Sequence, residues 1–108
     1  MCYQQRSDLN RIPAMGELAR PELDAFMALH ETAFRDGGAV PRKYRELAAL
    51  AVAMHKGCGY CVDTHTTAAL GAGAVAAEIA EITFVAAAVA AGAAGAHGLL
   101  ALRLGEGA

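Results

Sequence analysis

The sequence contains no tryptophan, and only three phenylalanines and three tyrosines occur among its 108 residues. It has no stretch of strand length in which apolar and polar residues alternate, which is the pattern of a half-buried β-strand. It shows neither an internal repeat with the spacing of a solenoid nor a glycine-rich motif that would hold a phosphate. The length suits one small domain, and these absences leave an all-helical one.

Clusters of like charge are also missing. The chain has 9 Lys and Arg residues against 11 Asp and Glu residues, a formal net charge of −2, and no basic run. This balance gives no sign of a nucleic-acid partner or an anionic membrane surface. The first residues are polar and no apolar signal core follows them, so we expect a cytoplasmic protein.

Cysteine is scarce, and its count of 3 is odd. A secreted disulfide framework uses an even number of cysteines, so the count argues against such a framework. Cys2 is the leftover thiol, and we expect no function for it because chain ends fray.

Residues 82–102 carry no Lys, Arg, Asp or Glu, and this stretch is long enough to span a bilayer. It is mostly alanine and glycine, however, and it contains His97 and few large apolar residues that would drive insertion. Gly92, Gly95 and Gly98 also interrupt it. We therefore expect no membrane contact and predict a buried pair of helices that pack closely through small residues.

Apolar residues at helical spacing predict about five short helices separated by glycine and proline. The first opens at Pro21 and ends at Gly37, and the others cover residues 41–55, 59–71, 75–91 and 99–104, with a bend at 92–98. Residues 1–20 are expected to be irregular apart from one helical turn at 13–18, and residues 21–108 to form one all-α domain. Because 56% of the residues are hydrophobic, we expect this domain to bury its excess apolar surface by forming a homo-oligomer.

The most informative stretch is the octapeptide Cys58-Gly-Tyr-Cys-Val-Asp-Thr-His65. Residues three and four apart share a face of a helix, so a helix from Gly59 onward brings Cys58, Cys61 and His65 together. Cys58 would lie at the first turn, where free backbone N–H groups and the helix dipole lower the pKa of a thiol. His65 is a candidate base for Cys61, and the two sulfurs could close a short disulfide. The arrangement is that of a redox pair.

Other interpretations of the two cysteines stay open. Cys-x-x-Cys can be half of a structural zinc site, but such a site needs four ligands, and His55 and His97 lack ligand spacing. Both thiols could instead be small buried hydrophobic residues. A thioredoxin-like motif would need a strand–helix context, which this sequence does not offer. His30, on the apolar side of the first helix, is expected to be a partly buried histidine without a catalytic role.

The run from Pro41 to Gly73 resembles the AhpD-like alkylhydroperoxidases of the carboxymuconolactone decarboxylase superfamily. There Arg-Glu-Leu-Ala-Ala-Leu-Ala-Val-Ala leads into Cys-Gly-Tyr-Cys-Val-Asp-Thr-His-Thr. The family pattern is a glutamate, eleven residues, and then Cys-x-x-Cys-x-x-x-His. It falls here on Glu46, Cys58, Cys61 and His65. The resemblance covers roughly residues 18–100, and this pattern is far more specific than Cys-x-x-Cys alone.

The resemblance implies an all-helical protomer that assembles as a homotrimer or homohexamer and needs no bound cofactor. It implies that Cys61 attacks a peroxide after activation by a Glu46–His65 proton relay. Cys58 would then condense with the oxidised Cys61 to form a disulfide. An external dithiol or a reductase protein would restore both thiols.

One position departs from the resemblance. The AhpD enzyme itself has a second histidine between its cysteines, where this chain has Tyr60. We expect Tyr60 either to form part of a pocket wall or to donate its hydroxyl. Because a fold does not fix a function, two alternatives to a peroxidase stay open. They are a carboxymuconolactone decarboxylase-type enzyme and a non-catalytic redox-responsive module.

Overall fold

The computed structural model describes residues 3–107, and all regular structure within them is helical. A 3-10 helix, η1 (Arg6–Arg11), is followed by five α-helices. These are α1 (Ile12–Leu18), α2 (Arg20–Ala33), α3 (Arg42–Lys56), α4 (Gly59–Gly71) and α5 (Ala76–Glu106). The prediction of an all-α single domain is therefore confirmed, whereas Cys2 lies outside the described residues.

Proline and glycine set most of the boundaries around α3 and α4, as the sequence indicates. Pro21 lies in the first turn of α2, and Pro41 is the N-cap of α3. Gly57 ends α3 in the left-handed conformation with φ 71°, which a glycine adopts without steric cost. Cys58 follows in extended conformation and is the N-cap of α4. A tight turn thus delivers the first cysteine to the start of a helix.

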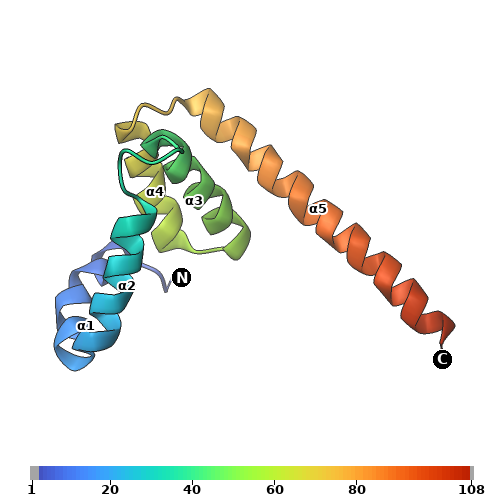
Figure 1. Ribbon diagram of the computed structural model, residues 1–108, viewed down its shortest axis with the longest axis horizontal. Coiled ribbons are helices and arrows are strands. Elements are labelled where there is room, and N and C mark those ends of the chain that lie inside the picture. The colour runs from blue at the N-terminus through green and yellow to red at the C-terminus, as the bar shows by residue number, and fades with distance from the viewer. Residues whose placement is uncertain (1–2, 108) are drawn as a thin grey trace.

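The N-terminal segment is more regular than predicted. Residues 6–18 form η1 and α1, where the sequence indicates one helical turn in an irregular segment. A capping box begins this structure, because the Asp8 carboxylate accepts the backbone N–H of Gln5 at 3.1 Å. Pro13 lies in the first turn of α1, which packs beside α2 (Figure 1).

The core is small and lies where α3 contacts α4 and the first part of α5. Leu50 and Ala69 are fully buried, and Ile79 and Ile82 of α5 pack against the cluster formed by Leu47, Ala69 and Ala74. Two polar contacts hold α5 to α3: Lys43 Nζ lies 3.0 Å from Glu78 Oε2, and Thr83 Oγ1 lies 3.5 Å from Met54 Sδ. α3 is therefore the helix on which the other two are positioned.

The C-terminal region differs most from the prediction. The expected bend at residues 92–98 is absent, and α5 is one continuous helix of 31 residues. None of the three glycines in that stretch has a positive φ, and no proline interrupts it, so the surrounding alanines keep the helix intact. Nor is the segment a buried pair of helices, because α5 leaves the body as an arm (Figure 1). By length and apolar composition alone, α5 could cross a membrane.

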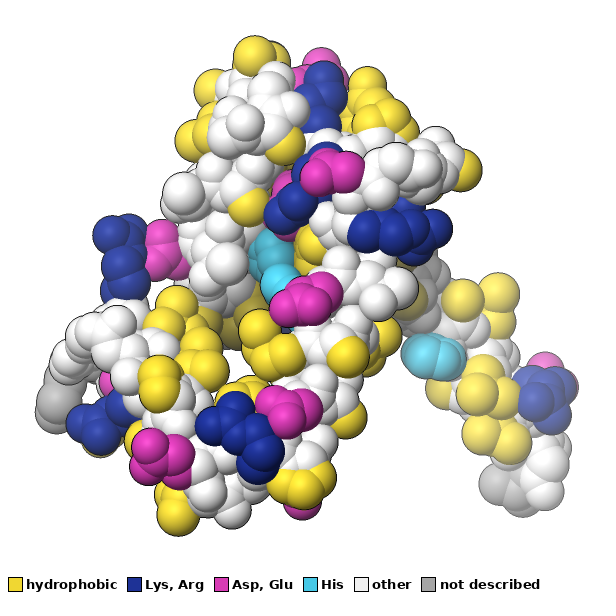
Figure 2. All heavy atoms as spheres, turned by 60° about the vertical axis from the view of Figure 1, so that its left-hand side comes forward, with side chains coloured by type: hydrophobic (Ala, Val, Ile, Leu, Met, Phe, Trp, Pro, Cys, Tyr) yellow, Lys and Arg dark blue, Asp and Glu magenta, His cyan; other side chains and the backbone are white. Residues whose placement is uncertain are grey.

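Much apolar surface of the chain is uncovered. The accessible surface is 7935 Å², whereas a compact monomer of this mass exposes about 5,700 Å². The radius of gyration is 17.9 Å, against about 13 Å for a compact domain of this length. Hydrophobic side chains are open to solvent along the protruding helix (Figure 2). The chain alone therefore buries less of its apolar surface than a self-contained domain does.

Candidate functional site

The two cysteines of the octapeptide meet at the first turn of α4. The Cys58 sulfur accepts the backbone N–H of Cys61 at 3.2 Å, so it serves as the capping acceptor of the helix. The Cys61 sulfur lies 2.6 Å from the Cys58 sulfur. Both cysteines are free and half-buried. The predicted position of Cys58 and its proximity to Cys61 are both confirmed.

These contacts make the two thiols unequal. The side-chain hydrogen bond between Cys58 and Cys61, together with backbone N–H groups of the first turn, lowers the pKa of Cys58 below its usual range. The same side-chain hydrogen bond raises the pKa of Cys61, and burial and the neighbouring Cys58 charge raise it further. Of the two thiols, Cys58 therefore ionises more readily than Cys61.

A second polar pair lies between α3 and α4. Glu46 projects from the first turns of α3 and is 1% exposed, and its Oε1 lies 3.4 Å from His65 Nδ1. Arg42, one turn earlier, approaches the same oxygen at 3.9 Å. The other carboxylate oxygen, Oε2, has no hydrogen-bond partner among the described residues. The predicted Glu46–His65 contact is thus present, in a setting that shields the carboxylate from water.

The imidazole of His65 is held by aromatic rings from α2. Phe34, at the C-terminal end of that helix, stacks on His65 with centroids 4.9 Å apart and planes at 20°. His30 lies behind it, 4.7 Å from the Phe34 centroid and 6.2 Å from the His65 centroid. His30 is half-buried, as predicted. The role of Phe34 has no signal in the sequence, because the stacking joins helices that are far apart in the chain.

The hydrogen bond that a base role of His65 toward Cys61 would use is not formed among the described residues. The two residues are one turn apart on α4, but no hydrogen bond joins them within residues 3–107, and the Cys61 thiol is engaged with Cys58. The site consists of two adjacent pairs, Cys58–Cys61 and Glu46–His65, rather than one connected chain. α4 and its N-cap residue supply three of these four residues, and α3 supplies the fourth.

The N-terminal segment covers the start of α4 through polar contacts that the sequence does not predict. Arg6 forms two hydrogen bonds with Asp63, at 2.6 and 2.9 Å, and the Gln4 side chain accepts the backbone N–H of Gly59 at 3.1 Å. Tyr60 donates its hydroxyl to Asp8 at 2.6 Å, which lowers the pKa of that carboxylate. The predicted hydroxyl-donor role of Tyr60 therefore has a partner in the N-terminal segment.

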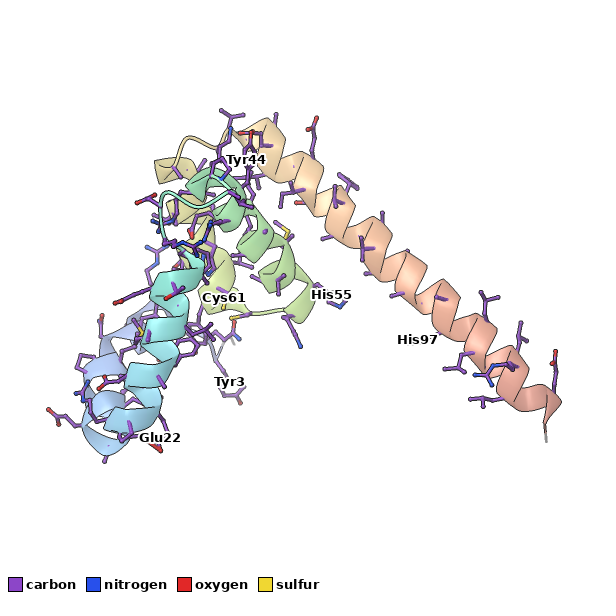
Figure 3. All side chains as sticks on the ribbon, in the orientation of Figure 1. Tyr3, Glu22, Tyr44, His55, Cys61 and His97 are labelled. Atoms are coloured by element: carbon purple, nitrogen blue, oxygen red, sulfur yellow. The ribbon has the colours of Figure 1, made fainter. Side chains whose placement is uncertain are left out.

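The surroundings contain no group that could hold a metal: within the described part of the chain, no three His, Cys, Asp or Glu side chains cluster. His55, at the end of α3, and His97, on α5, lie apart from Cys61 (Figure 3). Apolar hollows lie elsewhere. One of about 290 Å³ is lined by Ile12, Met15 and Phe26, and one of about 320 Å³ by residues of α3 and α5. Neither hollow is lined by Cys58 or Cys61.

Comparison with known proteins places the sequence in a family. The model of the carboxymuconolactone decarboxylase family matches residues 21–104. A similar protein is an uncharacterized one from Cupriavidus necator, 37% identical over 65 residues. That alignment covers 59% of this chain and 57% of the relative, so the chain spans little more than half the relative's length.

The unequal thiols generate a prediction about pH. Replacing Cys61 by alanine removes the first cause of the low pKa of Cys58, so that pKa should rise toward about 8.5. The change is measured as the pH midpoint of Cys58 alkylation by iodoacetamide, followed by peptide mass spectrometry in a Cys2→Ser background. The reciprocal variant, Cys58→Ala, should move the Cys61 midpoint in the opposite direction, downward. Unchanged midpoints in both variants would contradict the assignment.

Proposed function

The chain belongs to the carboxymuconolactone decarboxylase family, and from this premise we propose that it is a thiol-dependent peroxidase. Its substrate class is hydrogen peroxide or organic hydroperoxides. The observation that carries the proposal is the approach of the two sulfurs to 2.6 Å at a helix N-terminus that lowers the pKa of one of them. A thiolate is the nucleophilic form of cysteine, and its neighbour can close a disulfide.

The proposed cycle has three steps. A thiolate attacks one peroxide oxygen; the S–O bond forms as the O–O bond breaks, and the departing oxygen takes a proton to leave as water or alcohol. The second thiol attacks the resulting sulfenic acid, and water leaves as the S–S bond forms. An external dithiol or reductase protein then gives two electrons and two protons to the disulfide, which restores both thiols. No bound cofactor is needed.

The order in which the two thiols react depends on which of them is ionised. The resemblance assigns the attack to Cys61, but the hydrogen bonds lower the pKa of Cys58 and raise that of Cys61. Attack by Cys61 requires that its proton first leave, and the Glu46–His65 pair is the candidate acceptor. With Nδ1 protonated and donating to Glu46, His65 presents Nε2 as the base. The buried carboxylate would hold the ring in that tautomer and stabilise the imidazolium.

Cysteine variants and turnover measurements on this protein distinguish two other functions from the peroxidase. A lactone decarboxylase on this fold does not depend on a cysteine pair, so its activity would survive replacement of both cysteines. A non-catalytic redox module would close the Cys58–Cys61 disulfide without turning over peroxide. The close sulfurs support the peroxidase and the redox module alike, and turnover distinguishes them.

Turnover should depend on both thiols of the octapeptide. With dithiothreitol as reductant, stopped-flow consumption of hydrogen peroxide should fall at least about 100-fold in Cys58→Ser and in Cys61→Ser, because each breaks the disulfide cycle. Cys2→Ser is the matched control and should keep the wild-type rate. Wild-type consumption no faster than that of free dithiothreitol would refute the peroxidase, and turnover retained in either octapeptide variant would refute the disulfide cycle.

The Glu46 carboxylate should matter through its charge. Glu46→Gln keeps the size of the side chain but removes the charge that would stabilise a protonated His65. We expect a fall of about 10- to 100-fold in peroxide turnover at pH 7, as for loss of a group that supports a general base. Glu31→Gln, on the exposed surface of α2, is the control. If both variants turn over at the wild-type rate with an unchanged pH profile, Glu46 has no part in proton transfer.

A further inference from the structure

Residues 4–8, which we call the strap, lie across the start of α4. Every second residue of the strap contacts this helix. The contacts join Gln4 to Gly59, Arg6 to Asp63 and Asp8 to Tyr60. The α4 partners all lie within five residues of Cys58 in the sequence. The redox cycle proposed above gives the strap no task, so its place beside the cysteines needs another explanation.

The strap is next to the Cys58 sulfur. The N–H groups of a first helical turn point out of the same end of the helix. In α4 the N–H of Cys61 goes to the Cys58 sulfur at 3.2 Å, and the N–H of Gly59 goes to Gln4 Oε1 at 3.1 Å. The sulfur and the glutamine oxygen are therefore neighbours at that end of α4, and the strap occupies the surface beside the thiol.

Gly59 provides independent evidence for this close approach. Its φ is not positive, so the backbone does not require a glycine there. A Cβ atom built at Gly59 would collide with the side-chain oxygen of Gln4. Gly71, at the other end of the same helix, is different, because a Cβ atom built there meets nothing within 4 Å. The missing side chain at Gly59 thus provides the room in which the strap lies against α4.

The attachment of the strap is polar and exposed to solvent. Residues 4–7 are exposed, Asp8 is half-buried, and η1 contains no buried residue. The Arg6 side chain is 82% exposed, although it pairs with both carboxylate oxygens of Asp63. Segments with solvent-exposed hydrogen bonds and few buried apolar contacts open at a much lower free energy than the whole protein unfolds. The strap can therefore open while α3 and α4 stay packed.

We propose that the strap selects the reductant of the Cys58–Cys61 disulfide by size. With the strap closed, a small-molecule dithiol reaches the disulfide and a protein reductase does not. Opening of the strap admits the protein. This inference rests on the disulfide of the proposed function, and it adds that a small dithiol is the reductant that the closed protein accepts.

The size of a protein contact explains the selection. Transient redox complexes bury less than about 1,200 Å² in total, or up to roughly 600 Å² on each partner. A circular patch of that area extends roughly 14 Å from a sulfur at its centre. Asp63 is five residues beyond Cys58, about 7.5 Å along α4 at 1.5 Å per residue, so the strap lies within this patch. A small dithiol needs access to a sulfur alone.

The step that the strap controls is the first attack on the disulfide. A thiolate of the reductant attacks one sulfur, and the other sulfur leaves as a thiolate. The second thiol of the reductant then attacks the mixed disulfide, releases the protein and closes a disulfide of its own. Two electrons pass to the protein, and two protons end on Cys58 and Cys61. The strap changes which reductant arrives and leaves this chemistry the same.

Reduction rates with two reductants of different size test the gate. In a Cys2→Ser background, diamide closes the disulfide by accepting two electrons and two protons, so peroxide takes no part. Reduction by reduced thioredoxin or by dithiothreitol is then followed by alkylation and mass spectrometry. Arg6→Ala combined with Asp8→Ala removes two strap contacts without changing the net charge. Arg20→Ala combined with Asp24→Ala removes a salt bridge of 3.4 Å on α2 and is the matched control.

The strap variant should be reduced by thioredoxin at least about 10-fold faster than wild type. The reason is that a minor open form is populated to about 10% at most, and only that form reacts with the protein. Its rate with dithiothreitol should stay within about twofold of wild type, and the control should keep both rates. An unchanged ratio of the two rates overturns the gate. So does an equal rise with both reductants, which would mean that the strap stabilises the disulfide, or a slower reaction with thioredoxin, which would make the strap a docking surface.

The two glycines of α4 provide a second test that leaves the strap sequence intact. Gly59→Ala favours the helix but displaces the Gln4 side chain. It should raise the ratio of the thioredoxin rate to the dithiothreitol rate at least about twofold, the smallest effect expected for loss of one hydrogen bond. Gly71→Ala is the control and should keep the wild-type ratio. Equal ratios in the two variants overturn the proposal. Because diamide forms the disulfide, these results stand apart from peroxide turnover, which can fail while the gate holds.

Discussion

The site depends on one local arrangement, in which a cysteine sulfur caps the helix that carries its partner. The Cys58 side chain takes the place that a serine or aspartate oxygen occupies at most helix starts, and it accepts the N–H of Cys61. The cap fixes the sulfur over the first turn and brings the Cys61 thiol to it. The lowered pKa of Cys58, the raised pKa of Cys61 and the short path to a disulfide all follow from that geometry.

α3 provides the turn before the first cysteine and the carboxylate beside the histidine. It ends at the left-handed Gly57, which places Cys58 directly after it, and it buries Glu46 against His65. A buried carboxylate with one oxygen unpaired among the described residues destabilises the fold by about 1–3 kcal/mol. Costly buried carboxylates are typical of functional sites. The charge of Glu46 lies 3.4 Å from the His65 ring, which it could stabilise in the protonated form. The stacked ring of Phe34 keeps that histidine oriented.

The sequence predicts the features that arise from local chemistry. Pro41, Gly57 and the cysteine spacing define α3, the turn and the start of α4, and the family pattern predicts the Glu46–His65 contact. Prediction from the sequence fails where distant segments meet. The contacts of Arg6 and Tyr60 join residues more than fifty positions apart, and no local pattern encodes them. It also fails at residues 92–98, because glycine weakens a helix without necessarily breaking it, and alanine neighbours decide the outcome. No hydrogen bond joins His65 and Cys61 among the described residues, where the Cys61 sulfur is hydrogen-bonded with Cys58 instead.

The central claim is that Cys58 and Cys61 exchange two electrons with a peroxide. Titration of the reduced protein with hydrogen peroxide, followed by intact-mass and peptide mass spectrometry, tests it most directly. The account predicts loss of two hydrogens at one equivalent of peroxide, with Cys58 and Cys61 joined in one disulfide-linked peptide. If both cysteines stay reduced under excess peroxide, or if each is oxidised to sulfinic acid without a linkage between them, the redox account is wrong.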